Sequence, residues 1–441
     1  MQIDTVIHAR WVIPVEPEHV VYNHHAIAIH EGKILEVLAS RDADAKYNAK
    51  TTQRLDTHAL IPGLVNCHTH AAMNLFRGLA DDLTLMDWLN NHMWPAEQRW
   101  VSPEFITDGT RHAVAEMIRG GTTCFNDMYF FPDETAQAAT EAGIRAVVGL
   151  IIVDFPTAWA KNADEYFIKG EAVHDAYRHS PLITTAFAPH APYSVSDSSL
   201  ERIGVLAEEL DIPIHMHVLE TADEVRQSIE QNGERPLARL KRLGLLSSKL
   251  LAVHMTQIEK EEITEIANCG VNVVHAPESN LKLASGFCPV YELAQAGVNV
   301  ALGTDSAASN NDLDMFGEMR TAALLAKAVA CNARAIPASE TLRMATLNGA
   351  SALGIDNQIG SLLPEKQADI VAVDLSGIET QPIYNPLSQL VYATGRHQVT
   401  NVWVRGKQLL RDRALTTINR EVVLTKARQW QERIEGELAN R

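Results

Sequence analysis

LIPGLVNCHTH, residues 60–70, is the most informative stretch of this 441-residue chain. It is an apolar run that ends in His68 and His70, and helical patterns separate it from further runs of the same kind. Near-continuous apolar runs are typical of parallel strands that are buried on both faces. The others are GGTTCFNDM (120–128), IRAVVGLIIVD (144–154), LITTAFAPHAP (182–192), IPIHMHV (212–218), LLAVHM (250–255), VNVVHAP (271–277) and VNVALGTD (298–305).

The alternation of strands and helices predicts βα units and a parallel sheet. Eight such units over roughly 300 residues match a (β/α)8 TIM-type barrel with insertions. An open doubly wound sheet is the alternative, but polar residues at nearly every strand end suit a ring better. We therefore predict an α/β fold whose barrel spans residues 59–367.

Both ends of the chain differ from the middle in their sequence pattern. Residues 1–58 contain short β-type runs such as HHAIAIHEG. Similar runs return from residue 368 on, in ADIVAVDL and TNVWVRGKQL. Because chain termini often lie close together, we predict that residues 1–58 and 368–441 meet in one small β-sandwich domain. Residues 420–441 have the pattern of an amphipathic helix, with an apolar stripe of Val423, Leu424, Ala427, Trp430 and Ile434.

Composition limits the partners and the compartment. The formal charge of −17 argues against nucleic acid or an anionic membrane surface as the main partner. Five cysteines without any CxxC spacing predict no disulfide framework and favour a reducing compartment. The N-terminus lacks the pattern of a signal peptide, and no apolar run approaches the ~20 residues that span a bilayer. We expect a cytoplasmic protein that is not associated with a membrane.

Polar residues stand at the carboxyl ends of the predicted strands. His68 and His70 end the first strand, His217 ends the fifth and Asp305 ends the eighth. In a parallel barrel these ends converge on one face, where catalytic groups are found. His68 and His70 alternate with period two, so both imidazoles leave one face of their strand.

These four residues form a good ligand set for a divalent metal ion. Each signal is weak alone, since an isolated HxH proves little, Asp305 could cap the next helix, and only one of His215 and His217 is expected to reach the rim. Together, three neutral imidazoles and a carboxylate suit zinc or another divalent transition ion, with one position left for water. We predict one divalent ion per chain, zinc before others, which lowers the pKa of that water from 15.7 toward ~7.

Three further residues stand near these strand ends. Glu220 lies three residues after His217 and should overhang the site, where a carboxylate can protonate a ring nitrogen or a leaving group. It could also simply begin the next helix, where it suits the helix dipole. His254 ends the sixth strand and could be either an electrophilic group or a hydrogen-bonded core histidine. His190 ends the fourth strand.

With these residues in place, the chain resembles the amidohydrolase superfamily, and within it the methylthioadenosine/S-adenosylhomocysteine deaminase family. The resemblance covers nearly the whole chain, including the β-rich ends. The matching segments are PGLVNCHTHAAMNLFRGLADDL (62–83), WPAEQR (94–99), PHAPYSVS (189–196), HMHVLET (215–221), APESNLKLASG (276–286) and LGTDSAASNNDLDMFGEMR (302–320).

The resemblance implies roles for the residues at the strand ends. Glu220 would shuttle a proton to the purine ring nitrogen, and Asp305 would accept a proton from the attacking water. His254 would help to hold the resulting hydroxide. The metal ligands would be the same four as above, namely His68, His70, His217 and Asp305.

The resemblance also implies contacts to the nucleoside. Glu97, in WPAEQR, would accept hydrogen bonds from the ribose hydroxyls, although its sequence context is that of an ordinary exposed helix residue. His190 would contact the nucleoside from the fourth strand. Binuclear relatives carry a carboxylated lysine at the end of that strand, whereas this chain has Pro189-His190 there, so one metal ion is expected.

One stretch departs from the pattern of relatives that use S-adenosylhomocysteine. Those relatives place an arginine near the third strand, but residues 150–163 contain none, and Lys161 is their only basic residue. Apolar residues dominate there instead, which suits a methylthio group. This wall would consist of Ile151, Ile152, Phe155, Pro156 and Trp159, together with Trp88, Met93 and Trp94.

The predicted activity is hydrolytic deamination of 5′-modified adenosines. We expect 5′-methylthioadenosine to be preferred, with S-adenosylhomocysteine and adenosine as possible further substrates. One alternative is a hydrolase of another cyclic amidine, such as guanine, a pyrimidine or a chlorotriazine. Another is a barrel without catalysis that serves as a binding or assembly subunit. The expected partner is a small nucleoside, and we expect the chain to form a homo-oligomer.

Overall fold

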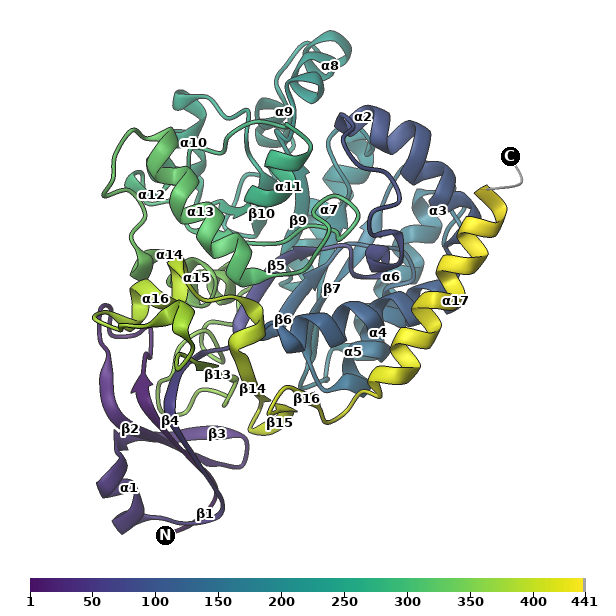
Figure 1. Cartoon of the computed structure of the whole chain (residues 1–441). Coiled ribbons are helices and arrows are strands. Elements are labelled where there is room, and N and C mark those ends of the chain that lie inside the picture. The colour runs from purple at the N-terminus through teal and green to yellow at the C-terminus, as the bar shows by residue number, and fades with distance from the viewer. Residues whose placement is uncertain (439–441) are drawn as a thin grey trace.

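Parallel strands from the middle of the chain form a barrel in the computed structural model, which describes residues 1–438 (Figure 1). Neighbouring strands pair in parallel in sequence order, as the repeated βα units predict. The eight strands are β5 (Leu64–Thr69), β6 (Thr122–Asp127), β7 (Arg145–Ile152), β8 (Ile183–Pro189), β9 (Ile214–Val218), β10 (Leu250–His254), β11 (Asn272–His275) and β12 (Val300–Leu302).

The first and last strands of this sheet close the ring. The backbone N–H of Asp305, just after β12, donates to the carbonyl oxygen of His68 in β5 at 3.0 Å. Gly303 lets the two strands approach this closely, because a Cβ atom there would lie 2.7 Å from the backbone nitrogen of His68. The predicted barrel is therefore confirmed over the open sheet.

Helices follow the barrel strands and cover their outer faces (Figure 1). Polar caps begin several of them: Ser102, Asn162, Ser196 and Thr221 each accept a hydrogen bond from a backbone N–H of the first turn. The helices between and after the barrel strands are α4 (Pro103–Arg119), α5 (Pro132–Ala142), α6 (Ala163–Tyr177), α7 (Asp197–Leu210), α8 (Ala222–Asn232), α9 (Pro236–Arg242), α10 (Lys260–Cys269), α11 (Pro277–Lys282), α12 (Val290–Gln295), α13 (Met315–Val329), α14 (Ala338–Met344) and α15 (Leu347–Ala352).

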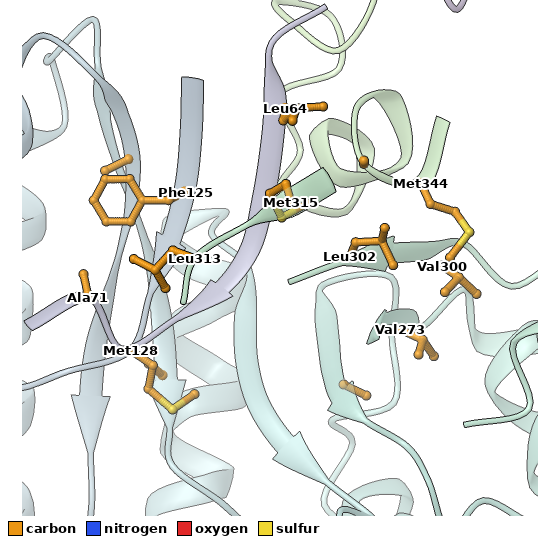
Figure 2. Packing of buried hydrophobic residues seen from close by; sticks show 14 of the residues in the cluster. Leu64, Ala71, Phe125, Met128, Val273, Val300, Leu302, Leu313, Met315 and Met344 are labelled. Carbon is orange, nitrogen blue, oxygen red and sulfur yellow. The ribbon is translucent and has the colours of Figure 1, made fainter. Parts of the chain in front are cut away.

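The main core lies between the strands and these helices. Figure 2 shows Val273 of β11 and Val300 and Leu302 of β12 on one side of the sheet, with Met344 of α14 reaching Val300. These side chains are all fully buried or nearly so. Burial of such side chains stabilises the fold by ~1.5–3 kcal/mol each, so the barrel is a rigid base for its loops.

The β-rich chain ends meet in one sheet of eight strands, in the order β16-β15-β14-β13-β4-β1-β2-β3. The sheet curls on itself, because Lys33 of β3 forms a β-bridge with Gln367, and a Cβ atom on Gly32 would lie 2.8 Å from the carbonyl oxygen of Arg405, just after β14. Ile7, Ile29, Ile370 and Trp403 share a buried cluster in this sheet. The strands are β1 (Gln2–Val12), β2 (Tyr22–His30), β3 (Lys33–Ala39), β4 (Asn48–Pro62), β13 (Ile370–Asp374), β14 (Val399–Val404), β15 (Lys407–Arg411) and β16 (Ala414–Leu415), with α1 (Ser40–Lys46) beside them.

Two segments, β4 and α17, extend across the boundary between the two predicted domains. The domain limits themselves stay a prediction. Strand β4 crosses residue 58 and leads almost directly into β5 of the barrel. Helix α17 (Arg420–Leu438) lies along α4 on the barrel, whereas the predicted limits place it in the sheet domain (Figure 1). Its apolar stripe explains this position, because Trp430 and Ile434 are buried in a cluster with Phe105 of α4.

Short helices between β5 and α4 stand over the carboxyl ends of the barrel strands. They are η1 (Ala71–Phe76), α2 (Leu85–Trp88), the π-helix η2 (Leu89–Met93) and α3 (Trp94–Trp100). The remaining short helices are η3 (Ile378–Thr380), α16 (Pro386–Tyr392) and η4 (Arg396–Gln398). Within residues 1–438, no helix has both the length and the apolar content to cross a membrane.

Candidate active site

The predicted metal ligands converge at the carboxyl ends of β5, β9 and β12. Oδ1 of Asp305 lies 3.2 Å from Nε2 of His68 and 3.3 Å from Nε2 of His70. Nε2 of His217 lies 3.2 Å from Nε2 of His68. Strands that are far apart in the sequence thus bring two overlapping sets of candidate ligand atoms together, namely His68 with His70 and Asp305, and His68 with His217 and His254.

Hydrogen bonds to backbone carbonyls orient two of these rings. Nδ1 of His70 contacts the carbonyl oxygen of Met128 at 2.5 Å, and Nδ1 of His217 contacts that of His190 at 2.7 Å. A carbonyl oxygen only accepts hydrogen bonds, so both Nδ1 atoms carry the proton. Each Nε2 atom then offers its lone pair to the centre, which is the form that a metal ion requires.

Asp305 is held in an unusual conformation by several donors. Its φ of +61° lies in the left-handed region, and its Oδ2 accepts hydrogen bonds from Ser279 at 2.6 Å and Ser309 at 3.0 Å. Burial acts to raise the pKa of Asp305, but hydrogen bonding and charge from His68 and His70 hold it well below its usual value. The carboxylate is therefore ionised and faces the centre.

Burial keeps most of the histidines at the centre neutral. It lowers the pKa of His68 to about 4 and that of His217 well below its usual value. His70 differs, since burial lowers its pKa but the hydrogen bond and charge of Asp305 raise it by more. His68 and His217 are thus neutral and Asp305 is ionised. Imidazoles beside a carboxylate are the donor set that suits zinc and similar divalent ions, so these residues fit the predicted cofactor.

Glu220 overhangs this centre from the turn after β9. Its side chain is 7% exposed, and Oε2 lies 3.8 Å from Nε2 of His254. Burial, followed by the negative charge of Asp305, raises the pKa of Glu220 to about 8. Glu220 is thus mostly protonated at neutral pH and can act as an acid.

Sequence reasoning missed the two residues that hold the Glu220 turn. Glu224 accepts hydrogen bonds from the backbone N–H groups of Leu219 at 2.9 Å and Glu220 at 2.7 Å, and Leu219 has a left-handed φ of +54°. The hydroxyl of Thr256 donates to the carbonyl oxygen of Glu220 at 2.7 Å. The peptide of Glu220 is therefore fixed on both sides. The available signal was a second carboxylate four residues after Glu220, in the first turn of α8.

His254 is oriented toward Glu220 by a partner on α11. Its Nδ1 lies 2.8 Å from Oδ1 of Asn280, which leaves Nε2 for Glu220 and the centre. The backbone of His254 has a φ of +78°, a left-handed conformation that is rare for a residue with a side chain. Such strain is concentrated at functional sites, which favours a role at the site over that of an ordinary core histidine.

A cavity of about 350 Å³ opens above these residues. Its floor contains His70, His190, His217, His254, Glu220 and Asp305, and its walls are largely apolar. Trp88, Met93 and Trp94 of the predicted wall line it, as do Ile151, Phe155 and Pro156, whereas Ile152 and Trp159 lie in the core behind it. Among the described residues that line the cavity, none is lysine or arginine.

Glu97 lies in the wall of this cavity and is not an ordinary exposed helix residue. The hydroxyl of Tyr129 donates to its Oε1 at 2.8 Å. Burial raises the pKa of Glu97 to about 7, although the Tyr129 hydrogen bond lowers it in part. The π-helix η2 precedes α3, and single π-helical turns within helices are frequent at functional sites. Tyr129, after β6, is a partner that sequence reasoning did not identify.

His190 connects the floor to the wall. Its ring lines the cavity, with Nδ1 3.0 Å from the hydroxyl of Ser194, and its carbonyl accepts from His217. The structure therefore brings together all eight residues that the sequence singled out: His68, His70, Glu97, His190, His217, Glu220, His254 and Asp305.

Comparison with known proteins agrees with this arrangement. The sequence model of the amidohydrolase family matches residues 59–409. The 5-methylthioadenosine/S-adenosylhomocysteine deaminases of Saccharophagus degradans and Teredinibacter turnerae are each 49% identical to this chain, over 99% and 98% of it, and 98% of each relative is covered.

Solved structures give the same picture. A zinc-bound adenosine deaminase from Xanthomonas campestris is 55% identical, with a TM-score of 0.98 over 99% of both chains. A zinc-bound atrazine chlorohydrolase from Arthrobacter aurescens superposes with a TM-score of 0.89 over 97% of this chain and 99% of its own, but it is only 24% identical. That second likeness concerns the fold alone.

Proposed function

The chain belongs to the amidohydrolase family, and on this premise we propose that it hydrolytically deaminates 5′-modified adenosines. The preferred reaction converts 5′-methylthioadenosine to 5′-methylthioinosine and ammonia, and S-adenosylhomocysteine and adenosine are further candidate substrates. One observation carries the proposal: a protonated acid, Glu220, stands over a set of metal-ligand side chains at the floor of a cavity whose wall holds a second, partly buried carboxylate, Glu97.

The proposed cofactor is one divalent ion per chain, most simply zinc, held by Nε2 of three histidines and by Asp305. When bound, such an ion lowers the pKa of a water molecule and supplies a hydroxide nucleophile at neutral pH. Strand β8 ends in Pro189 and is followed by His190, so the lysine that bridges two ions in binuclear relatives has no counterpart. The ligands would be His68, His70, His217 and Asp305.

Hydrolytic deamination needs proton donors and acceptors at defined atoms. The oxygen of one water molecule bonds to the amidine carbon, the bond from that carbon to the exocyclic nitrogen breaks, and ammonia leaves. Glu220, protonated at the start, donates to the adjacent ring nitrogen during the attack. The ionised Asp305 takes the first proton of the water, and that proton reaches the leaving amine.

The second proton of the water restores Glu220 when the new carbonyl forms. His254 assists these transfers, because Asn280 fixes its Nδ1 and leaves Nε2 at the centre beside Glu220. Glu224 and Thr256 keep Glu220 in place while its proton moves. A positioned acid of this kind contributes ~10²–10⁴-fold to a rate.

The wall of the cavity supports a nucleoside with an uncharged 5′ group. Glu97 would accept hydrogen bonds from the ribose hydroxyls, and His190 would contact the nucleoside. Trp94, Ile151 and Phe155 offer apolar surface for a methylthio group. The carboxylate of S-adenosylhomocysteine would find no lysine or arginine among the described lining residues, and burying an unpaired charge costs several kcal/mol.

The main alternative is hydrolysis of another cyclic amidine, such as guanine, a pyrimidine or a chlorotriazine. A free base has no ribose, so it would leave Glu97 with only its hydrogen bond from Tyr129. A second alternative is a barrel without catalysis that serves as a binding or assembly subunit. Such a subunit would not need Glu220, an acid with a pKa of about 8, above the proposed metal ligands. Both alternatives are open to direct test.

The test is ammonia release from a panel of substrates by one preparation. We expect kcat/KM to fall in the order 5′-methylthioadenosine, S-adenosylhomocysteine, free adenine. A difference of ~1.4 kcal/mol in transition-state binding gives a tenfold preference. Activity on guanine or a pyrimidine with none on adenosines would refute the substrate class, and no activity at all in metal-loaded protein would refute catalysis.

Three further parts of the proposal concern the protein in its cell. Metal analysis after dialysis should find one divalent ion per chain, and two retained ions would contradict the ligand assignment. The five cysteines are all free in the structure, which fits the reducing cytoplasm. Self-association into a homo-oligomer stays a prediction from the sequence, to be measured by light scattering.

A further inference from the structure

His215 is the histidine of His215-Met216-His217 that does not reach the metal centre. It lies one pleat deeper in β9 than His217 and is 0% exposed. Its Nε2 is 2.9 Å from Nδ1 of His68, and the two rings meet edge to face with centroids 4.9 Å apart. It therefore contacts the far side of a proposed ligand, where the proposed function gives it no role.

The direction of this hydrogen bond follows from the other side of the His68 ring. Nε2 of His68 faces Oδ1 of Asp305 and Nε2 of His217, so it must carry a lone pair if it is to bind an ion. The proton of His68 then sits on Nδ1 and is donated to Nε2 of His215. His70 and His217 donate in the same way to backbone carbonyls, whereas His68 alone among the three depends on a side chain.

His215 does not serve the core as an apolar residue would. Its Nδ1 is buried and has no hydrogen-bond partner among residues 1–438. The residue opposite it in β10 is Leu251, which belongs to a buried apolar cluster. An unsatisfied buried polar atom destabilises a fold by ~1–3 kcal/mol, so an apolar side chain would suit this position better. What His215 adds is the one hydrogen bond of its ring, to Nδ1 of His68.

We propose that His215 is a positioning residue that holds His68 in the tautomer and ring orientation needed to bind a divalent ion. The inference rests on the proposed function, because it assumes that His68 is a ligand. Partners behind a ligating histidine typically change metal affinity or activity by ~10–100-fold when they are mutated. A role in core packing would instead act on the stability of the metal-free protein.

The experiment measures zinc affinity by competition with a chelator, together with the unfolding temperature of the metal-free protein. His215→Leu removes the acceptor but keeps an apolar filling, and we expect zinc to bind ~10–100-fold more weakly with no loss of thermal stability. His215→Gln keeps an acceptor oxygen and should recover most of the affinity.

His275 supplies a matched control. It is another buried histidine of the barrel, 1% exposed, and its Nδ1 also has no partner in the described chain. His275→Leu should leave zinc affinity as in the wild type. If His215→Leu fails to fold, His215→Met and His215→Gln carry the same comparison, since both are unbranched and only Gln offers a strong acceptor.

The outcomes separate this inference from the proposal beneath it. Unchanged zinc affinity in folded His215→Leu or His215→Met overturns the positioning role, as does an equal loss in His275→Leu. A wild-type protein that binds no zinc refutes the metal site itself. A wild-type protein that binds zinc but releases no ammonia from any nucleoside refutes the substrate class and leaves the affinity comparison valid.

Discussion

The floor and the wall of the cavity are built differently. The floor residues stand on strand ends or tight turns, are buried or largely buried, and have partners behind them, as Asp305 has Ser279 and Ser309. Most of the wall is made of short helices and loops, where Phe155 is 42% exposed. Barrel strands thus hold the groups that react, and the segments between them hold the groups that recognise the substrate.

The wall is nevertheless anchored from outside. Helix α3 carries Glu97 toward the cavity, while Trp100 on the same helix meets Trp430 of α17 with ring centroids 6.4 Å apart. Nε1 of Trp430 donates to Asp108 of α4 at 3.1 Å. The last helix of the chain therefore supports the part of the site that would bind the ribose. Changes to the floor should abolish chemistry, and changes to the wall should alter substrate choice.

The largest effect is expected from removing a floor ligand. His217→Ala should abolish both metal binding and ammonia release, because the remaining protein ligands leave an incomplete set. Metal content and activity are measured on the same dialysed sample. His179→Ala, which replaces an exposed histidine on the surface, is the control and should behave as wild type. A His217→Ala protein that keeps its ion would remove His217 from the ligand set.

The next largest effect is a loss of turnover without a loss of the metal ion. Glu220→Gln should keep the ion and the fold but lose turnover, by ~10²–10⁴-fold and toward the upper end, because one carboxylate serves more than one proton transfer. Glu230→Gln, at an exposed position of α8, is the matched control. The shuttle assignment fails if the Glu220→Gln enzyme retains more than about a tenth of the wild-type kcat.

A smaller effect should mark the wall. Glu97→Gln removes a charged acceptor, and hydrogen bonds to charged groups are worth ~1.5–3 kcal/mol, so kcat/KM for nucleosides should fall by ~10–100-fold. Activity on free adenine, which has no ribose, should not fall. Glu209→Gln, at an exposed position of α7, controls for the loss of a charge. An equal loss on adenine and nucleosides would place Glu97 outside ribose recognition.

The smallest effect is a pH dependence that differs between floor and wall. Burial raises the pKa of Glu220 to about 8, so its acid form is lost and kcat should decline as pH rises through that value. Burial raises the pKa of Glu97 to about 7, so its ionised form is lost and KM should increase as pH falls through that value. Each effect is at most about tenfold per pH unit. Profiles of kcat and KM against pH check both effects. The decline of kcat at high pH should be absent in Glu220→Gln.

Much of the floor could be predicted from local pattern. Period-two spacing puts His68 and His70 on one face of a strand, and parallel strands of a barrel deliver their carboxyl ends to one rim. The residue type of each ligand and its place at a strand end are both visible in the sequence. The resemblance to relatives added Glu97, whose own context is that of a surface helix.

Contacts between distant segments could not be predicted in this way. Tyr129 reaches Glu97 and Asn280 reaches His254 only because the fold brings separate loops together. The same holds for α17, which pattern alone assigned to the sheet domain and which the apolar cluster around Phe105 draws onto the barrel.

The histidine pair of β9 shows where the limit lies. Alternation along the strand puts His215 and His217 on one face, but depth along the barrel axis separates a ligand position from the layer beneath it. That depth follows from the register with β8 and β10, and the partner of His215 follows from closure of the ring onto β5. Residue chemistry and periodicity are properties of a short stretch of chain. Register, closure and burial are properties of all the strands packed together, because each depends on contacts that form only when the whole barrel is assembled.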